Sequence, residues 1–440
     1  MNRYSRFKMI PLMILVLGVA APLAAQERGV VERESKGYVE EILKTLDVNA
    51  GGTLSVRTPM GAIEVESWAK DEVQVRVLKR YRGSSEDKAE KAFERIEVYI
   101  ERQGNDVLVR ATSDSRRDND KTGLLFEITV PARYNVDLET SGGSITVGDL
   151  AGRVLAETAG GSISVGEISG GDVEVETKGG SISIEGIENG SGLAVTAGGS
   201  ITVGDVTGTL DVKTAGGSIN LNRIGGKTHA ETSGGSITIG ESGGDLAAET
   251  AGGSIHIGSV DGKVMVDTAG GSITVGPAAG DVEARTSGGS IHLKPCGGAV
   301  TAGTSGGSIS VDGSGGPVEV ETSGGSIQID DARGFIEAST AGGSIEAELS
   351  VSERDVDTHC TLTSSGGDLI LWIPEDLAAS FDVELKITRW ADEDYEITSD
   401  FPLTINRSDR GVACSGDING GGDPIRLRTV NGDIEIRKIR

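Results

Sequence analysis

Serine recurs more regularly than any other residue that could do chemistry in this chain. The tetrapeptide Gly-Gly-Ser-Ile occurs twelve times, always with a Thr four residues before the Ser. A nucleophilic serine of the strand-to-helix type needs the pattern G-x-S-x-G, but no copy has a Gly two residues after its Ser. Twelve identical copies also argue against one unique active site, so we expect a protein that is not an enzyme. The twelve serines are Ser144, Ser162, Ser181, Ser200, Ser218, Ser236, Ser254, Ser272, Ser290, Ser308, Ser326 and Ser344.

Glycine pairs followed by a hydroxyl residue could also form a phosphate-binding loop. Such a loop needs Gly-Lys-Ser/Thr after an earlier, spaced Gly. The tripeptide Gly226-Lys227-Thr228 lacks that earlier Gly. We therefore expect no nucleotide cofactor.

The four histidines are the natural candidates for metal ligands. His256 and His292 occupy equivalent positions two repeats apart, which predicts a separation of about 9–10 Å, too far for one metal ion. We expect all four, His229, His256, His292 and His359, to be solvated surface residues, and no metal to be bound.

Paired carboxylates recur on one face of the repeats, for example Glu174 with Glu176 and Glu319 with Glu321. Glycosidases use such pairs, beside aromatic side chains that hold the sugar rings. Phe335 is the only aromatic residue between positions 135 and 350. A polysaccharide-active enzyme on a β-helix is therefore a less favoured alternative.

The three cysteines, Cys296, Cys360 and Cys414, form no C-x-x-C pair, so zinc and redox motifs have no support. Cys360 and Cys414 are candidates for a disulfide in an oxidising compartment, and two buried free thiols are an equal alternative. Cys296 stands where other repeats have an apolar residue, which favours a small buried side chain over a reactive one.

The N-terminus is typical of a secretory signal peptide over residues 1–25. A basic start with Arg3, Arg6 and Lys8 precedes an apolar run and the small residues Ala24 and Ala25, after which we expect cleavage. An uncleaved anchor is the alternative, and no later stretch is apolar and long enough to span a bilayer. We expect an exported protein, in the periplasm or outside the cell.

The composition limits the classes of molecule that the protein can bind. The formal net charge of -26 argues against nucleic acid and against docking on anionic lipid headgroups. The content of 67 Gly with 3% aromatics indicates repetitive turns rather than collagen or disorder. We expect a monomer that contacts an unidentified component of the envelope or cell surface.

The repeated phrase predicts the fold. Its spacing is 18 residues except for two steps of 19, around positions 186 to 191. Within "GRVLAETAGGSISVGEIS", residues Val154, Ala156 and Thr158 alternate with polar neighbours, and Ile163 and Val165 do so after the glycines. This period of two indicates two short strands per repeat. Ile168 marks a second corner, with Leu150, Val206, Ile224 and Val260 as its counterparts.

One repeat offers about five inward apolar side chains, too few to offset the entropy of ordering eighteen residues. Repeats must therefore stack on one another, which predicts an all-β, single-chain parallel β-solenoid with 18-residue coils and about 4.8 Å per coil. A triangular hexapeptide helix fails, because stepping by six from Ile145 reaches Glu157. A calcium β-roll needs carboxylates in its turns, and Asp149, Asp172 and Asp205 are not repeated as ligand pairs. A flattened, two-sheet coil fits best.

Each part of the phrase then has an expected role. Thr140, Ile145 and Val147 face the core, and Ser144 faces water, so replacing such a serine is expected to matter little. The glycine pairs, Gly142 with Gly143 and Gly160 with Gly161, form the turn, either by supplying positive φ or by leaving room for backbones to stack.

The two ends differ from the middle. Residues 26–134 hold a degenerate unit from Thr58 to Ile63, a helix from about Glu86 to Arg95 capped by Ser85, and a hairpin through Gly104-Asn105. Residues 135–350 hold the twelve regular coils, and residues 351–440 hold further degenerate coils. Because solenoid ends expose strand edges, we expect the aromatic residues there, Trp68, Trp372 and Trp390 among them, to build caps rather than a binding platform.

The entry "ITVPARYNVDLETSGGSITVGDLAG" and the ending "INGGGDPIRLRTVNGDIEIRKI" resemble the bacterial putative-adhesin family of β-strand-repeat proteins, also called toast-rack proteins. The resemblance runs from about Ala50 to Arg440. It implies a β-solenoid of the cell envelope or exterior, and it carries no catalytic residues to transfer. This chain departs from the family by its longer and more regular middle.

The exposed positions flanking each Ile form a row of hydroxyl groups that could bind a partner. The resemblance and this row favour a non-catalytic, adhesin-like binding or structural rod. An envelope-stress sensor is the alternative that some relatives imply. Ice binding is disfavoured, because Asn220, His256, His292, Gln328 and Glu346 interrupt the row. The candidate binding residues are Ser144, Thr146, Ser162, Ser164, Ser200, Thr202, Ser236, Thr238, Ser272 and Thr274.

Overall fold

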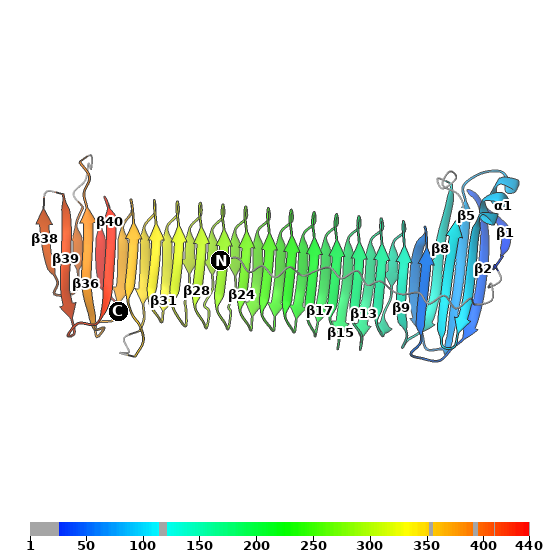
Figure 1. The fold of residues 1–440 in the computed structure, drawn as a ribbon, viewed down its shortest axis with the longest axis horizontal. Helices are drawn as coiled ribbons and strands as arrows, with labels where there is room; N and C mark the ends of the chain where they lie inside the picture. The colour runs from blue at the N-terminus through cyan, green and yellow to red at the C-terminus, as the bar shows by residue number, and fades with distance from the viewer. Residues whose placement is uncertain (1–25, 114–120, 352–354, 390–394, 409, 440) are drawn as a thin grey trace, which may run out of the picture.

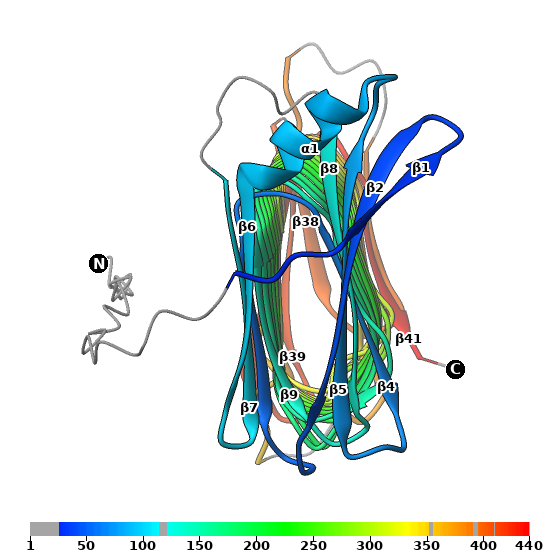
Figure 2. The same cartoon turned by 90° about the vertical axis from the view of Figure 1, so that its right-hand side faces the viewer.

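Each repeat folds as one coil of two strands joined by two corners. The computed structural model describes residues 26–113, 121–351, 355–389, 395–408 and 410–439. In the coil that holds β12 (Val154–Thr158) and β13 (Ile163–Ser169), alternate residues are buried as the period of two predicts. The coils stack into a long rod (Figure 1), and the end-on view shows its two facing walls (Figure 2).

The first strands of the coils form one wall, which we call sheet A. They are β9 (Asn135–Thr140), β12, β14 (Val173–Thr177), β16 (Gly192–Thr196), β18 (Leu210–Thr214), β20 (Thr228–Thr232), β22 (Leu246–Thr250), β24 (Val264–Thr268), β26 (Val282–Thr286), β28 (Val300–Thr304), β30 (Val318–Thr322) and β32 (Ile336–Thr340).

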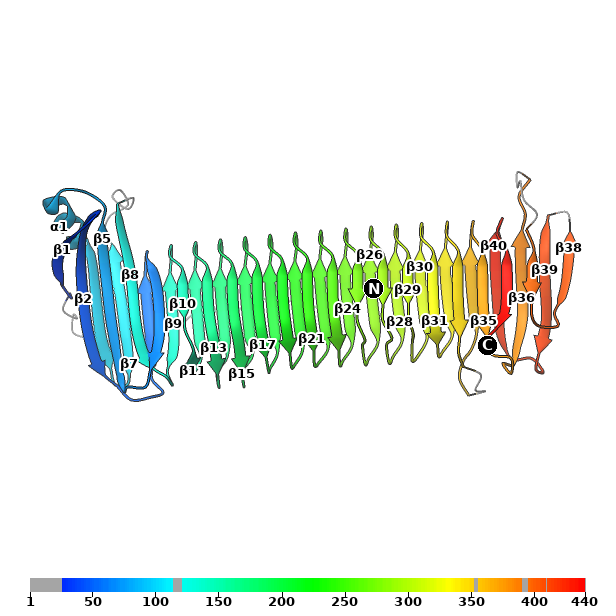
Figure 3. The same ribbon diagram turned by 180° about the vertical axis from the view of Figure 1, so that it is seen from behind.

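The second strands form the opposite wall, which we call sheet B (Figure 3). They are β10 (Ile145–Val147) with the short β11 (Leu150–Ala151), β13, β15 (Ile182–Glu188), β17 (Ile201–Val206), β19 (Ile219–Ile224), β21 (Ile237–Ser242), β23 (Ile255–Val260), β25 (Ile273–Val275), β27 (Ile291–Leu293), β29 (Ile309–Val311), β31 (Ile327–Ala332) and β33 (Ile345–Leu349).

Like residues stack on like residues along both sheets. Ile237 pairs with Ile219 on one side and with Ile255 on the other, in parallel register. Thr250 lies between Thr232 and Thr268 in the same way. The predicted parallel β-solenoid with two short strands per coil is confirmed.

The two longer repeats contain one extra residue each, at the corner after the second strand. Gly170, with φ 65°, follows β13, and Asn189, with φ 56°, follows β15. The amide of Gly170 donates a hydrogen bond to the carbonyl of Glu188, so the two widened corners lie one on the other. The interval of 186 to 191 therefore locates only the second insertion. Glycine and asparagine suit these corners because they tolerate the left-handed region.

The interior holds a third row of inward residues at the second corner. Leu150, Ile168, Val206, Ile224 and Val260 are all buried there, as expected. Where the row has a hydroxyl, that group is satisfied: the Ser314 hydroxyl, which has one hydrogen to donate, lies within hydrogen-bond distance of the carbonyls of Gly298 (3.0 Å) and Gly316 (2.8 Å). Small polar residues thus fit the row without an unpaired buried group.

The N-terminal cap continues both sheets, first with parallel pairings and then, at the outer strands, with antiparallel ones. Sheet A gains β3 (Thr53–Thr58), β7 (Asp106–Ser113) and β6 (Ile96–Gln103), and the β6–β7 hairpin turns at Gly104 as predicted. Sheet B gains β4 (Ala62–Trp68), β8 (Thr122–Pro131), β5 (Glu72–Tyr81), β2 (Gly37–Asp47) and β1 (Val30–Glu34).

The helix α1 (Glu86–Glu94) lies over this end of the rod (Figure 2). Its residues Ala89 and Phe93 are buried against Tyr38. Ser85 occupies the N-cap position, but its side chain makes no capping hydrogen bond, contrary to the prediction. Glu86 and Asp87 in the first turn still favour the positive end of the helix dipole.

Stacking order departs from chain order at both ends. At the N-terminal end, β3 pairs with β7 and with β9, so the first coil is inserted between two later ones. At the C-terminal end, β40 (Asp423–Val430) pairs with β34 (Cys360–Ser364) and with β36 (Ala379–Lys386), and β41 (Ile434–Lys438) pairs with β35 (Leu369–Ile373) and β37 (Ile397–Ser399). The last coil of the chain is therefore held between earlier strands.

Sheet A ends beyond β36 with β39 (Gly411–Ile418) and β38 (Thr404–Ser408), which pair antiparallel. Several aromatic residues of the described ends are buried in the caps, for example Phe126, Tyr134 and Phe381. The predicted Trp68 and Trp372 are half-buried there. The proposed signal peptide and Trp390 lie outside the described residues.

Candidate functional site: the repeated phrase and the two outer faces

The buried threonine of the repeated phrase links neighbouring coils. Thr250 donates a hydrogen bond from its hydroxyl to the carbonyl of Gly235 in the preceding coil (2.8 Å). The same hydroxyl accepts a hydrogen bond from the amide of Gly253 in its own turn (3.3 Å). The pattern recurs from Thr158 to Thr340. At the C-terminal end Ser364 and Thr429 make the equivalent bond. This threonine is therefore a structural staple.

The second glycine of each pair is required by close stacking. A Cβ on Gly253 would lie 2.1 Å from the carbonyl oxygen of Gly235, whereas one on Gly252 would meet nothing closer than 3.3 Å. The turn glycines Gly142, Gly143, Gly160 and Gly161 do not adopt left-handed φ values. Of the two predicted roles, room for stacking is thus the one observed.

The turn serine has a structural role that the sequence analysis did not predict. Ser236 is exposed, yet its hydroxyl oxygen accepts a hydrogen bond from the amide of Ser254 in the next coil (3.2 Å). The same bond joins successive coils from Ser162 to Ser344. Asp368 and Asp433 take over the acceptor role beyond the last regular coil. Recurrence of a short acceptor at one position was the available signal.

The candidate hydroxyl residues lie in two separate rows. The turn serines Ser144, Ser162, Ser200, Ser236 and Ser272 form one row, in which Ser200 is half-buried. The second row runs along the outer face of sheet B, where each residue pairs with its equivalent in the next coil. It contains Thr146, Ser164, Thr202, Thr238 and Thr274, with Thr274 half-buried. Asn220 and the two histidines do interrupt it.

The two outer faces of the rod differ chemically. On sheet B the exposed central row is mostly uncharged. On sheet A the outward row near the strand ends is rich in carboxylates. It contains Glu139, Glu157, Glu176, Glu231, Glu249, Asp267 and Glu321. The carboxylate pairs Glu174 with Glu176 and Glu319 with Glu321 are exposed on this face, and Glu174 contacts Arg153 (3.3 Å).

Aspartates at the second corner accept hydrogen bonds from the next coil rather than form pairs of metal ligands. Asp172 accepts a hydrogen bond from the amide of Ser191 (2.8 Å), and Asp149 accepts one from Glu167 (2.9 Å). Asp205 accepts from the side-chain amide of Asn222 (2.6 Å). Within the described residues, no group of three or more His, Cys, Asp or Glu side chains is placed to hold a metal ion.

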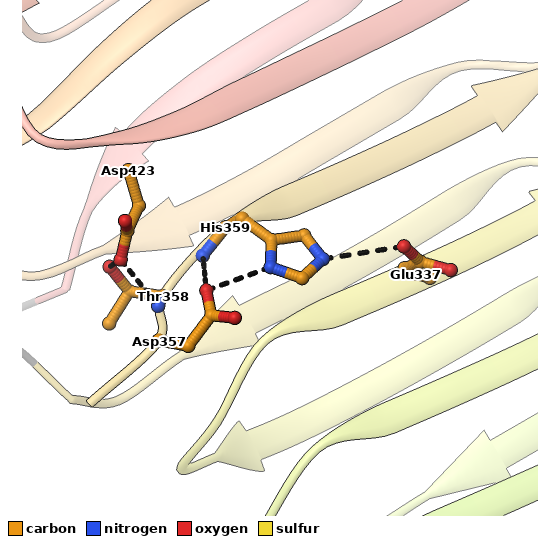
Figure 4. A network of polar contacts seen from close by, with 5 residues as sticks. All are labelled: Glu337, Asp357, Thr358, His359 and Asp423. Carbon is orange, nitrogen blue, oxygen red and sulfur yellow. Dashed lines mark hydrogen bonds and ion pairs between the residues drawn. The ribbon is translucent and has the colours of Figure 1, made fainter.

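His359 departs from the expectation of a solvated histidine. Its ring stacks on Phe335 with centroids 4.4 Å apart, and its nitrogens lie 2.8 Å from Asp357 and 3.3 Å from Glu337 (Figure 4). Burial disfavours its charged form, but the hydrogen bonds with the two carboxylates outweigh burial and raise the pKa of His359. The neighbouring Thr358 donates to Asp423 of β40, which ties this coil to the cap.

The other histidines lie on the outer faces. His256 and His292 occupy the same row two coils apart, as predicted. His229 contacts Asp211 on sheet A (3.0 Å), and this hydrogen bond raises the pKa of His229 and lowers that of Asp211.

The cysteines are all buried and free, which excludes the disulfide between Cys360 and Cys414. Cys360 lies on β34 and Cys414 on β39, and the strands β40 and β36 lie between them. Three strand spacings are about 14 Å, twice the Cα separation that a disulfide spans. Burial raises the pKa of each thiol, which disfavours the reactive thiolate.

One family model matches the chain, and several solved structures are similar to it at low sequence identity. The family model described as Toastrack DUF4097 matches residues 53–259 and 244–437. A "putative adhesin" from Parabacteroides distasonis is 15% identical, with 64% of this chain and 97% of that chain covered and a TM-score of 0.30. A "putative lipid binding protein" from the same species is 15% identical, with coverage of 64% and 96% and a TM-score of 0.25.

A "putative adhesin" from Bacteroides fragilis is 14% identical, with 64% of this chain and 97% of that chain covered and a TM-score of 0.22. No curated protein matches the chain significantly. Over the residues that the structure describes, the helix is too short and polar to cross a membrane.

Proposed function

The chain belongs to the toastrack family, and on that premise we propose that it is an exported, non-catalytic binding rod of the cell envelope or cell surface. Export is proposed from the basic, apolar and small-residue order of residues 1–25. Binding is proposed from the way in which the repeat uses its side chains.

The proposal rests on one observation: within each repeat, some residues hold the stack together and others only face outward. The hydroxyl of Thr250 and that of Ser236 are both engaged in bonds between coils. Gly253 is fixed by backbone packing, and Ile255 is buried. These four invariant residues of the phrase therefore support the stack, whereas the outward rows vary from coil to coil.

Those outward rows make long, rigid surfaces with different chemistry. Sheet A presents carboxylates such as Glu176 and Glu249, and sheet B presents hydroxyls such as Thr202 and Thr238. Solenoids commonly bind partners on such extended faces, because stacking holds the side chains in fixed rows.

A pull-down with the purified chain as bait tests this proposal. Envelope fractions should yield one or a few partners that a heat-denatured bait does not retain. Two face variants should locate the contact: Thr202→Lys with Thr238→Lys on sheet B, and Glu176→Lys with Glu249→Lys on sheet A. A specific partner lost with one variant and kept with the other supports a binding rod. Recovery of the same proteins by native and denatured bait contradicts it.

A further inference from the structure

An open groove crosses the outer face of sheet A, and its lining residues come from β16 to β28 and the corners that precede these strands. These strands lie in the middle of the rod (Figure 1). Its volume is about 860 Å³. Asp211, His229, Ala247, Met265 and Glu283 are neighbours in one row across the strands. The corner residues that precede these strands, among them Lys227 and Lys263, form the other wall.

The centre of the groove is apolar, and Asp211, His229 and Glu283 lie on either side of it in the same row. Ala247 and Met265 occupy adjacent positions of the row, and Met265 is 52% exposed. Among the described residues, the other large hydrophobic side chains that are exposed, Val30, Leu43 and Ile405, lie in the end caps. The same row also holds Leu155 and Leu193 nearer its N-terminal end, but both are half-buried, whereas Met265 is exposed.

The charges around this apolar centre are not balanced. On the corner wall Lys227 is paired with Asp245 (3.0 Å) and Lys263 with Asp281 (2.6 Å). Two residues further along the same strands as Ala247 and Met265, on a flank beyond the groove lining, Glu249 and Asp267 are exposed and directly adjacent in register. Neither forms an ion pair with a described residue, and Arg285, the next neighbour of Asp267, pairs with Glu283. Adjacent carboxylates in a parallel sheet lie about 5 Å apart and repel one another. A cation placed beside them would relieve that repulsion.

We propose that this groove binds an extended, basic and amphipathic peptide segment of a partner protein. An apolar side chain of the segment packs on Met265 and Ala247, and its Lys or Arg side chains contact Glu249 and Asp267. The row from Asp211 to Glu283 crosses five strands and spans roughly 20 Å, which is the length of about six extended residues. The net charge of -26 steers such a segment toward the rod. The inference rests on the proposed binding function and names the chemistry of its partner.

The same features disfavour other occupants. Aromatic rings, on which sugars stack, do not line the groove. Anionic lipid headgroups would be repelled by the acidic flank. A basic peptide with apolar residues matches both the centre and the flank.

Fluorescence anisotropy with a labelled eight-residue peptide of alternating Leu and Lys tests the inference on the purified chain. Binding should saturate, and Met265→Ser should weaken it about tenfold. Asp267→Ser should weaken it about threefold and reduce its dependence on salt. The repeat supplies matched controls: Leu155→Ser and Glu157→Ser alter the same two rows far from the groove and should leave binding unchanged.

Several results would overturn the inference. These are binding that does not saturate, equal losses in the groove variants and their controls, or equally tight binding of an octa-lysine peptide. Dextran or neutral phosphatidylcholine vesicles that bind in a Met265-dependent way would replace the peptide with a glycan or a lipid. A pull-down partner that Met265→Ser retains would refute the groove and leave the binding rod standing, so the two proposals fail separately.

Discussion

The coil array and the N-terminal cap hold the same two sheets together by different means. In the array, one set of contacts recurs: the staple of Thr250, the packed Gly253 and the stacked Ile255 have equivalents in every coil. In the cap, by contrast, each stabilising contact occurs at one place only. Lys79 and Glu40 form a buried ion pair (3.0 Å), and the Lys79 ammonium also donates to the carbonyl of Phe93 in α1 (3.3 Å).

The effect of a substitution should therefore depend on the region in which it lies. A coil touches only its two neighbours, so damage in the array should be local and independent of which coil is altered. The cap closes the end of the stack through contacts that no other residue duplicates. Substitutions in both regions test this contrast, in order of decreasing effect.

Ile237→Asp should have the largest effect. Ile237 is fully buried between Ile219 and Ile255, so the variant places a charge in the core, at a loss on the order of 5 kcal/mol. Thermal unfolding followed by circular dichroism should show a lower or split transition. Ile273→Asp should behave alike, and a clear difference between the two would show that the coils are not equivalent.

Lys79→Met should come next, at about 3–5 kcal/mol, because it leaves Glu40 buried without its cation. Chemical unfolding measures the loss. The double variant Lys79→Met with Glu40→Gln should recover at least half of it, since the amide is uncharged and can still accept from Gly29. If the double variant were as unstable as the single one, the pair would not be the important contact.

Gly253→Ala should destabilise by about 3 kcal/mol, because its Cβ would overlap the backbone of the preceding coil. Gly252→Ala, one residue away, should change the free energy of unfolding by less than about 1 kcal/mol. Equal melting temperatures for the two variants would contradict the stacking geometry.

Thr250→Val should have a smaller effect, about 1–3 kcal/mol, because it removes a buried hydroxyl that both donates and accepts between backbones. Ser236→Ala should lose about 0.5–1 kcal/mol, because water can reach the amide that it leaves unpaired. Urea unfolding should show a larger loss of stability for Thr250→Val than for Ser236→Ala. The reverse order would contradict the role of the threonine hydroxyl in linking coils.

The periodic part of the fold could be predicted from the sequence, because all twelve copies of the phrase show nearly the same spacing and a similar alternation of apolar and polar residues. The alternation around Ile163 assigned the inward residues, and the spacing assigned the register. The insertion of β3 and β40 between other strands could not be predicted, because stacking order at the ends depends on long-range pairing of degenerate coils. The free state of Cys360 and Cys414 follows from that order.

The surfaces were less predictable than the core. A hydroxyl row on sheet B is visible in the sequence, because its positions follow from the period. The bonding of Ser236 was missed, because an exposed acceptor and a solvated side chain have the same pattern. The groove around Met265 depends on which side chains meet across five coils, and no single repeat shows it.

Deletion of one whole coil tests most directly whether the repeated coils are interchangeable structural units. Removal of residues 300–317 joins Ala299 to Val318 and brings Val282 against Val318 in the same register. We predict a folded, shorter rod that melts cooperatively within about 5 °C of the parent. Removal of only residues 300–308 should unfold the array. It deletes the sheet A strand β28 and its turn, so that the sheet B strand β29 would directly follow the corner at Ala299, which normally leads into sheet A. A whole-coil deletion that fails to fold, or a half-coil deletion that melts like the parent, would contradict the account.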